Sequence, residues 1–281
     1  MSIRIITDAA ADLSREEIST LGVQVIPLQV IFGSETYLSG ETLDRDVFWR
    51  RLLAGETPST SQPSPETFLH AFEDAHSAGD EVVYISISSA LSGTMQSAVL
   101  ARSMVNADIV HIVDSNSVTI GQKLLIIAAC RLRDEGRTAA QIVQEIEQLR
   151  SRVCVLATVD TLEYLARGGR ISRAAASIGT LAQLKPMIMV SPEGRVDVCG
   201  KSIGRHRAID ALVRKIASYQ IDRDYPVIPV YSHEAENADA FMRRLVKEGI
   251  PCAANLLTDL GPAIGTHVGP NAYGLAFIRQ A

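Results

Sequence analysis

The sequence has 281 residues, of which 47% are hydrophobic and 5% aromatic, and its formal net charge is −5. This length suffices for two domains of ordinary size, and an aliphatic core with few aromatic residues is typical of buried parallel strands. The negative charge argues against a nucleic-acid partner, which would need a clustered basic face.

In the first half of the chain, short β-type runs alternate with helical stretches. Predicted strands cover residues 3–7, 23–32, 82–86 and 108–113, and predicted helices cover residues 14–21, 44–53, 64–77, 92–105, 117–135 and 138–150. This alternation predicts a parallel sheet with helices on both faces and ligands at the carboxyl ends of its strands. We expect this α/β domain to span residues 1–152.

After residue 150 the pattern changes. Predicted strands cover residues 153–159, 187–190, 196–199, 227–231, 252–256 and 275–278, and predicted helices cover residues 162–166, 206–217 and 237–247. The turn-like sequence Ser191-Pro192-Glu193-Gly194 predicts a hairpin. A hairpin among β-α units predicts a mixed sheet, and hence a second, different α/β domain at residues 153–281. No proline- or serine-rich linker separates the domains, so the crevice between them is the expected binding site.

Two hydroxyl-rich segments precede predicted helices. The first is Thr60-Ser61-Gln62-Pro63-Ser64-Pro65, and the second runs from Ser86 to Thr94. Turns into helices present free backbone N–H groups and hydroxyls, and neither segment contains an acid, a base or a cysteine. Together they predict a neutral cradle that holds a carboxylate or phosphate without attacking it. The alternative interpretation is that these residues are ordinary helix caps and turns.

Several features bear on metals, cofactors and location. The four cysteines, Cys130, Cys154, Cys199 and Cys252, are widely scattered, which predicts neither a zinc site nor disulfides. Asp8 and Asp114 end predicted strands, but no second clustered carboxylate accompanies them, so we expect no metal and no cofactor. The chain begins with a strand rather than a basic-apolar leader, and no apolar run reaches membrane-spanning length. We therefore expect a soluble, cytoplasmic protein without stable membrane insertion.

Four motifs resemble those of the DegV family, in the same order and over nearly the whole chain. They are Thr60-Ser61-Gln62-Pro63-Ser64-Pro65, Ser88-Ser89-Ala90-Leu91-Ser92-Gly93-Thr94-Met95-Gln96-Ser97-Ala98, Thr161-Leu162-Glu163-Tyr164-Leu165-Ala166-Arg167-Gly168-Gly169-Arg170-Ile171 and His267-Val268-Gly269-Pro270. DegV proteins are bacterial fatty-acid-binding carriers, some of which present the acyl chain to a fatty acid kinase. The resemblance implies two different α/β domains with a long-chain fatty acid between them, and a carrier rather than an enzyme.

By motif match, the resemblance implies that Thr60 and Ser92 hold the carboxylate. Further contacts to the headgroup or a phosphate are expected from Ser61, Gly93, Thr94, Arg205 and His267. Docking to a fatty acid kinase is expected from Arg170 and Arg173. We also expect the aliphatic residues 178–184 and the run 186–189 to line the acyl tunnel.

The sequence departs from the family pattern at three positions. Met95 stands where the family often has tyrosine, which bears on acyl-chain selectivity. Ile203 stands where a basic residue is common, although Arg205 remains, and Asn271 replaces the glycine that often follows Gly-Pro. The last two departures bear on the kinase-coupled role.

Two other classes of function stay open. Ser92, His267 and Asp8 would form a nucleophile triad in an acyl-transfer or hydrolytic enzyme, although no G-x-S-x-G motif occurs and no histidine lies near either hydroxyl segment. A dihydroxyacetone-kinase-like substrate subunit would use a histidine to hold a ketone. A bound long-chain acid without turnover would separate the carrier from both. The preferred acyl chain, the identity of the kinase and the oligomeric state stay open.

Overall fold

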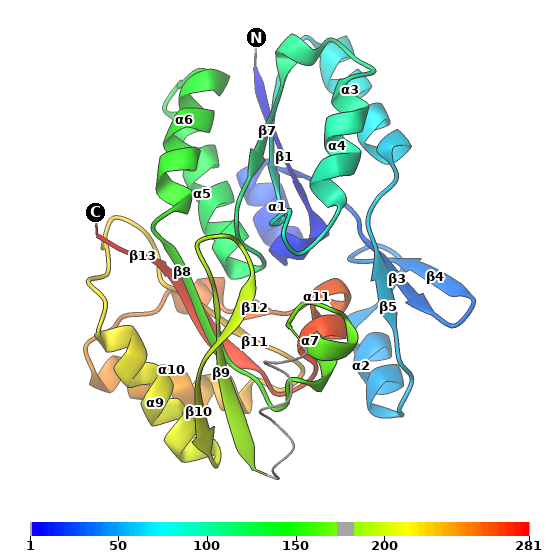
Figure 1. The fold of residues 1–281 in the computed structure, drawn as a ribbon. Coiled ribbons are helices and arrows are strands. Elements are labelled where there is room, and N and C mark those ends of the chain that lie inside the picture. Colours follow the sequence, from blue (N-terminus) through cyan, green and yellow to red (C-terminus); the bar gives the residue numbers. More distant parts are fainter. Residues whose placement is uncertain (1, 173–182, 281) are drawn as a thin grey trace.

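A computed structural model describes residues 2–172 and 183–280 of the chain (Figure 1). The first sheet has the strand order β2-β1-β6-β7, formed by β1 (Ile3–Asp8), β2 (Gln24–Ile26), β6 (Glu81–Ser86) and β7 (Val110–Asp114). All neighbouring strands pair in parallel. The predicted parallel sheet is therefore confirmed.

Helices cover both faces of this sheet, because successive strand residues point to opposite sides. Ile6, Val82 and Tyr84 pack on the face covered by α3 (Pro65–Ala78) and α4 (Thr94–Arg102). Ile5, Val83 and Ile85 belong to the core on the other face, which contains α5 (Ile120–Asp134) and α6 (Ala139–Arg150). The remaining helices of this domain are α1 (Arg15–Leu21) and the short 3₁₀ helices η1 (Ala9–Ala11) and η2 (Ala107–Ile109).

The second sheet is mixed, as predicted, with the order β10-β9-β8-β13-β11-β12. Its strands are β8 (Val153–Thr158), β9 (Leu184–Val190), β10 (Val196–Ile203), β11 (Ile228–Tyr231), β12 (Thr258–Asp259) and β13 (Tyr273–Ile278). Only β11 and β12 pair in parallel, and the other pairs are antiparallel. The helices α9 (Arg205–Ala217) and α10 (Glu236–Lys247) pack on one face.

The other face of the second sheet packs against the first domain. Helix α5 contacts β1 and β6 of the first sheet and β8, β11 and β13 of the second. One continuous apolar core therefore spans both sheets, and it includes Ile5, Leu124 and Ala276. The predicted domain boundary, between residues 152 and 153, falls between α6 and β8 and stays a prediction.

The structure contains a third, small antiparallel sheet of order β4-β3-β5, which the sequence did not predict. The predicted strand at residues 23–32 is two strands, β2 and β3 (Gln29–Phe32), which separate at Pro27, a residue that lacks an N–H donor. Strand β3 pairs with β4 (Glu35–Leu38), which was not predicted, and with β5 (Ser59–Ser61). The neighbouring α2 (Arg45–Leu53) was predicted.

Further corrections concern the C-terminal part. The predicted strand at residues 252–256 is wrong, since residues Ala254–Leu256 form a 3₁₀ helix, η3, and β12 follows it. An unpredicted helix, α11 (Pro262–Val268), contacts α7 (Glu163–Arg167) as well as β3 and β5 (Figure 1). Pro262 opens α11 at a position that needs no N–H donor, and Gly269 ends it with φ 74°. Arg173 and most of the predicted tunnel segment, residues 178–182, lie outside the described residues.

Candidate functional site

The two hydroxyl segments meet at a small cavity beside α11. Thr60 on β5, Ser92 before α4, His267 on α11 and Arg170 after α7 supply its polar lining. The remaining lining is apolar and consists of Leu28, Ile87, Leu91, Val118, Leu165, Val196, Ala263, Ile264 and Val268. The cavity volume is about 70 Å³. Four of the predicted site residues, Thr60, Ser92, His267 and Arg170, thus lie on one cavity whose other walls are apolar.

His267 is bound to Thr60. Its Nε2 atom lies 2.7 Å from Oγ1 of Thr60, and its Nδ1 atom is buried with no hydrogen-bond partner among the described residues. Burial, together with the charge of Arg170, lowers the pKa of His267 to about 4, so the ring is neutral at pH 7. Gly168 leaves room for this ring, because a Cβ atom there would lie 2.1 Å from Nδ1.

The second hydroxyl segment is locked to the first by Gln62. Oγ of Ser92 lies 2.8 Å from Oγ1 of Thr94 and accepts a hydrogen bond from the Thr94 backbone at 3.3 Å. Nε2 of Gln62 donates to Oγ of Ser97 at 3.0 Å, and a Cβ atom at Gly93 would lie 1.9 Å from Oε1 of Gln62. The lack of a side chain at Gly93 therefore lets the two segments approach closely.

Asp8 and Asp114 support the same segment. Asp8 is fully buried and accepts hydrogen bonds at 2.9 Å from the Ile87 backbone and from the Tyr84 hydroxyl. Burial raises the pKa of Asp8, and these hydrogen bonds oppose the shift. Asp114 accepts from the backbone of Ser89 and Asn116, with the latter bond at 2.9 Å. Both carboxylates therefore hold the backbone of the loop.

The catalytic triad that was considered as an alternative is not assembled. His267 forms its hydrogen bond with Thr60 rather than with Ser92, and Asp8 accepts hydrogen bonds from Tyr84 and from backbone groups. A nucleophilic serine needs its base within hydrogen-bond reach and a third group that orients the base. The described geometry provides neither for Ser92.

Arg170 contributes a cation to the cavity. Its Nε atom donates to the Leu91 carbonyl at 3.1 Å, and its Nη1 atom donates to the Gly168 carbonyl. Burial lowers the pKa of Arg170. Within the described ranges, 2–172 and 183–280, no carboxylate forms an ion pair with it. An anion in the cavity would therefore meet a partly desolvated positive charge.

The other predicted contacts lie around the cavity or away from it. Ser61, Gly93 and Thr94 adjoin it but do not line it, and Oγ of Ser61 lies 3.4 Å from the Gln62 carbonyl. Arg205 is exposed and lines a separate pocket on the second sheet. The sequence did not predict that Gln62 joins the two hydroxyl segments, because an exposed glutamine beside a proline carries no functional signal by itself.

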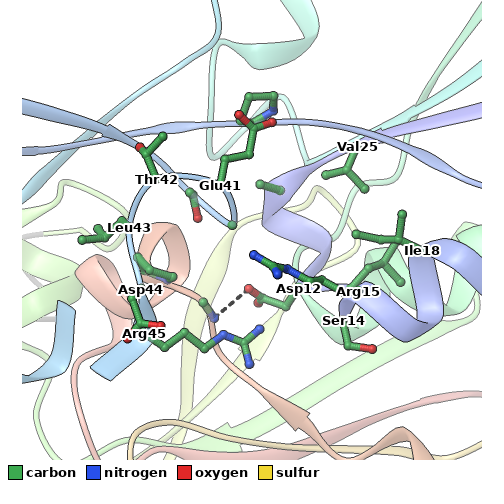
Figure 2. Close-up of a pocket in the computed structure, with 17 residues that line it drawn as sticks. Asp12, Ser14, Arg15, Ile18, Val25, Glu41, Thr42, Leu43, Asp44 and Arg45 are labelled. Carbon is green, nitrogen blue, oxygen red and sulfur yellow. Dashed lines mark hydrogen bonds between the residues drawn. The ribbon is translucent and has the colours of Figure 1, made fainter. Parts of the chain in front are cut away.

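A larger cavity of about 710 Å³ adjoins the start of α11 (Figure 2). Arg15, Arg45 and Asp12 lie around it, and it contains none of the residues of the hydroxyl cradle. Oδ1 of Asp12 accepts a hydrogen bond from the Gly261 backbone at 2.8 Å, the bond that is dashed in Figure 2. This bond ties the first domain to the helix that carries His267.

Two further observations describe the chain as a whole. Among the described residues, no three histidine, cysteine, aspartate or glutamate side chains gather as metal ligands would. No helix in the described part of the chain is long and apolar enough to cross a bilayer.

Comparison with known proteins identifies the family. A family model described as "Uncharacterised protein, DegV family" matches residues 2–280. The chain belongs to the DegV family. A DegV domain-containing protein of Deinococcus radiodurans is 34% identical over 277 residues, which cover 98% of both chains.

Solved structures of DegV proteins share the fold. A DegV family protein of Thermus thermophilus, described as binding fatty acid, matches with a TM-score of 0.89 and 31% identity over 100% of both chains. A stearic-acid-binding protein of Eubacterium ventriosum matches with a TM-score of 0.90 and 27% identity, covering 99% of this chain and 98% of the other. These two neighbours are described as fatty-acid-binding proteins rather than as catalysts.

Proposed function

We propose that this DegV protein binds a long-chain fatty acid between its two domains, with the carboxylate held by Thr60 and Ser92. One observation carries the proposal. One cavity brings together the hydroxyls of Thr60 and Ser92, the neutral ring of His267 and the cation of Arg170, which forms no ion pair with a described carboxylate. The other walls of this cavity are apolar. The fatty acids bound by related DegV structures support the same assignment.

The two ends of such a ligand have different energetic roles. A buried carboxylate costs free energy unless it is hydrogen-bonded, and each hydrogen bond to a charged group contributes roughly 1.5–3 kcal/mol. An acyl chain gains about 0.8 kcal/mol for each buried CH₂ group. The tail therefore supplies most of the affinity, while Thr60, Ser92 and Arg170 fix the position of the carboxylate.

The acyl chain must enlarge the cavity that it enters. The volume of about 70 Å³ is small beside the ~300–1,000 Å³ of most small-molecule sites. Leu165, on α7, and Ile264, on α11, both line the cavity, and these two helices contact each other. We expect these helices to move apart when the chain enters.

The protein acts, in this proposal, as a carrier that presents the carboxylate to a separate fatty acid kinase. Thr60 and Ser92 are half-buried rather than enclosed, which leaves the headgroup reachable from outside. The sequence has no P-loop motif, so the phosphoryl donor would come from the partner. This role places the protein in the cytoplasm. Arg170 and Arg173 remain our proposed docking residues, with Arg170 also available to the carboxylate.

A binding experiment tests the headgroup assignment. Thr60→Ala and Ser92→Ala should each weaken binding of oleate about ten-fold, the equivalent of one charge-assisted hydrogen bond. Ser59→Ala is the control, because Ser59 is exposed on the same strand and does not line the cavity. Oleyl alcohol should bind all four proteins alike. An equal loss for acid and alcohol would contradict the assignment.

A second experiment tests the carrier role. Arg173→Glu should lower acyl-phosphate formation by a fatty acid kinase from the same source, while oleate binding stays unchanged. If the reversal leaves the rate of acyl-phosphate formation unchanged, Arg173 does not dock the kinase. If no such kinase acts on the loaded protein, it is a carrier of another kind.

A further inference from the structure

A separate polar pocket of about 250 Å³ lies on the second sheet, where α9 begins. It shares no residue with the cavity that holds Thr60 and Ser92. Its lining includes Thr158, Lys185 and Tyr273 on strands and Arg205, the first residue of α9. The fatty-acid proposal leaves this pocket without a role.

Two buried hydroxyls in this pocket lack partners. Thr158 on β8 and Tyr273 on β13 are 1% and 3% exposed, and they are directly opposite each other in the antiparallel register. Neither Oγ1 of Thr158 nor the Tyr273 hydroxyl has a hydrogen-bond partner in the described part of the chain. Burial raises the pKa of Tyr273 to about 12, although the neighbouring Thr158 hydroxyl and the charge of Arg205 oppose the shift, so this hydroxyl keeps its proton at pH 7 and can donate. The two hydroxyls face each other across the strand pair, and one O–H can donate to the other, but the second O–H is then left without an acceptor among the described residues. Buried hydroxyls are rarely left unpaired, so the pair points to an absent acceptor.

The start of α9 has an unusual charge pattern. The first turn of a helix normally favours acids, because its N–H groups form the positive end of the helix dipole. The first turn of α9 contains Arg205, His206 and Arg207 and no acid, and no side chain caps it at Gly204. An anion at this end would relieve the repulsion between the two arginines and the dipole.

The remaining charges in the pocket largely cancel. Lys185 forms an ion pair with Asp160, and Nδ2 of Asn271 donates to the same carboxylate at 3.4 Å. Arg205 forms no ion pair with a described residue. Besides Asp160, the lining contains one more acid, Glu234, which lies near His233. The groups left over are mostly donors: the Arg205 guanidinium, the two hydroxyls and the first N–H groups of α9.

We propose that this pocket binds a phosphate group, either free or as the monoester of a small molecule or lipid. Arg205 would supply the charge, Tyr273 and Thr158 would donate from their strands, and the start of α9 would add backbone donors. The volume leaves room for more than the phosphate itself, which favours an ester. This proposal does not depend on the binding of a fatty acid.

Isothermal titration of the full chain with inorganic phosphate and with glycerol 3-phosphate tests the site. We expect saturable binding that weakens about ten-fold in Arg205→Gln and in Tyr273→Phe, each of which removes one donor group. Arg207→Gln is the matched control, since Arg207 lies in the same helical turn and lines none of the described pockets. Its affinity should stay within about two-fold of wild type, because its charge is exposed to solvent.

The three phosphate probes distinguish a free phosphate, a small ester and a lipid headgroup as the ligand, and they can also contradict the proposed site. Binding of glycerol 3-phosphate without binding of inorganic phosphate would identify an ester, and binding only of phosphatidic acid vesicles would identify a lipid headgroup. An equal loss in Arg205→Gln and Arg207→Gln would show diffuse surface charge instead of a site. The absence of saturable binding to all three probes would overturn the proposal.

Discussion

Nε2 of His267 lies 2.7 Å from Oγ1 of Thr60, although the two residues are 207 positions apart in the sequence. The contact joins β5 of the small sheet to α11 and forms one end of the cavity. Because the His267 ring is neutral and its Nδ1 atom has no partner among residues 2–172 and 183–280, the pair offers hydrogen bonds but no countercharge. The positive charge at this site comes from Arg170 instead.

Gly168→Ala should disturb this pair without unfolding the protein. A Cβ atom at residue 168 would lie 2.1 Å from Nδ1 of His267, so the ring must shift. We expect oleate binding to weaken about ten-fold, as for the loss of one hydrogen bond to the carboxylate. Gly200→Ala is the control, because an added Cβ there meets only ordinary contacts at 3.6 Å or more. Equal affinity in the two variants would contradict the positioning of His267 by Gly168.

The stability of the protein should depend on the protonation of His267. Its pKa is about 4 in the folded protein against 6.5 in its unperturbed state, so the unfolded chain binds the proton more tightly between these values. Stability from the neutral ring is therefore present above pH 6.5 and is lost as the pH falls toward 4, by roughly 3 kcal/mol at most. Urea unfolding at several pH values should show this loss in wild type and not in His267→Gln. Parallel pH profiles for both proteins would be inconsistent with the buried neutral ring.

Asp12 should show the opposite dependence. Burial raises its pKa from 3.8 to about 6, and hydrogen bonds and nearby cations oppose the shift. The stability from its protonated form is present below pH 3.8 and is lost as the pH rises through 6, so the charged form costs up to roughly 3 kcal/mol at pH 7.5.

Asp12→Asn should therefore stabilise the protein at pH 7.5, by roughly 1–3 kcal/mol, with a smaller gain at pH 4. Asparagine keeps an acceptor for the Gly261 backbone and tolerates the left-handed φ of 50°. Asp12→Ala, which lacks the acceptor, should not stabilise. Urea unfolding distinguishes the two variants, and equal destabilisation by both at pH 7.5 would mean that the charge itself is needed.

The sequence predicted the two sheets because their strands, such as β6 and β13, contain apolar runs that can be recognised without knowing what packs against them. It did not predict β5, since Ser59, Thr60 and Ser61 carry no apolar pattern and become a strand only by pairing with β3. Helix α11 was missed for a similar reason. Its Gly265 lowers helix propensity, yet it lets the helix pack against Phe48 and Trp49, where a Cβ atom would lie 2.7 Å and 2.9 Å from the rings.

The residues of the candidate site likewise fall into those that the sequence predicted and those that only the structure shows. The two hydroxyl-rich segments were found from their composition, the resemblance to the DegV family singled out Thr60 and Ser92 within them, and the structure brings these two residues to one cavity. Arg170 lies on that cavity because it donates to the carbonyl of Leu91, which is distant in sequence, and to the carbonyl of nearby Gly168. The sequence does not reveal these contacts, so it predicted a docking role at the surface for Arg170. The unpaired hydroxyls of Thr158 and Tyr273 have no sequence signal, because they matter only through the register of two strands.

The most direct test of the fatty-acid proposal is mass spectrometry of the ligand extracted under denaturing conditions from the purified protein. We predict a free fatty acid with a long acyl chain, close to one molecule per protein, and a higher melting temperature when palmitate or oleate is added to delipidated protein. An extract without fatty acid, together with a melting temperature that neither acid changes, would contradict the proposal.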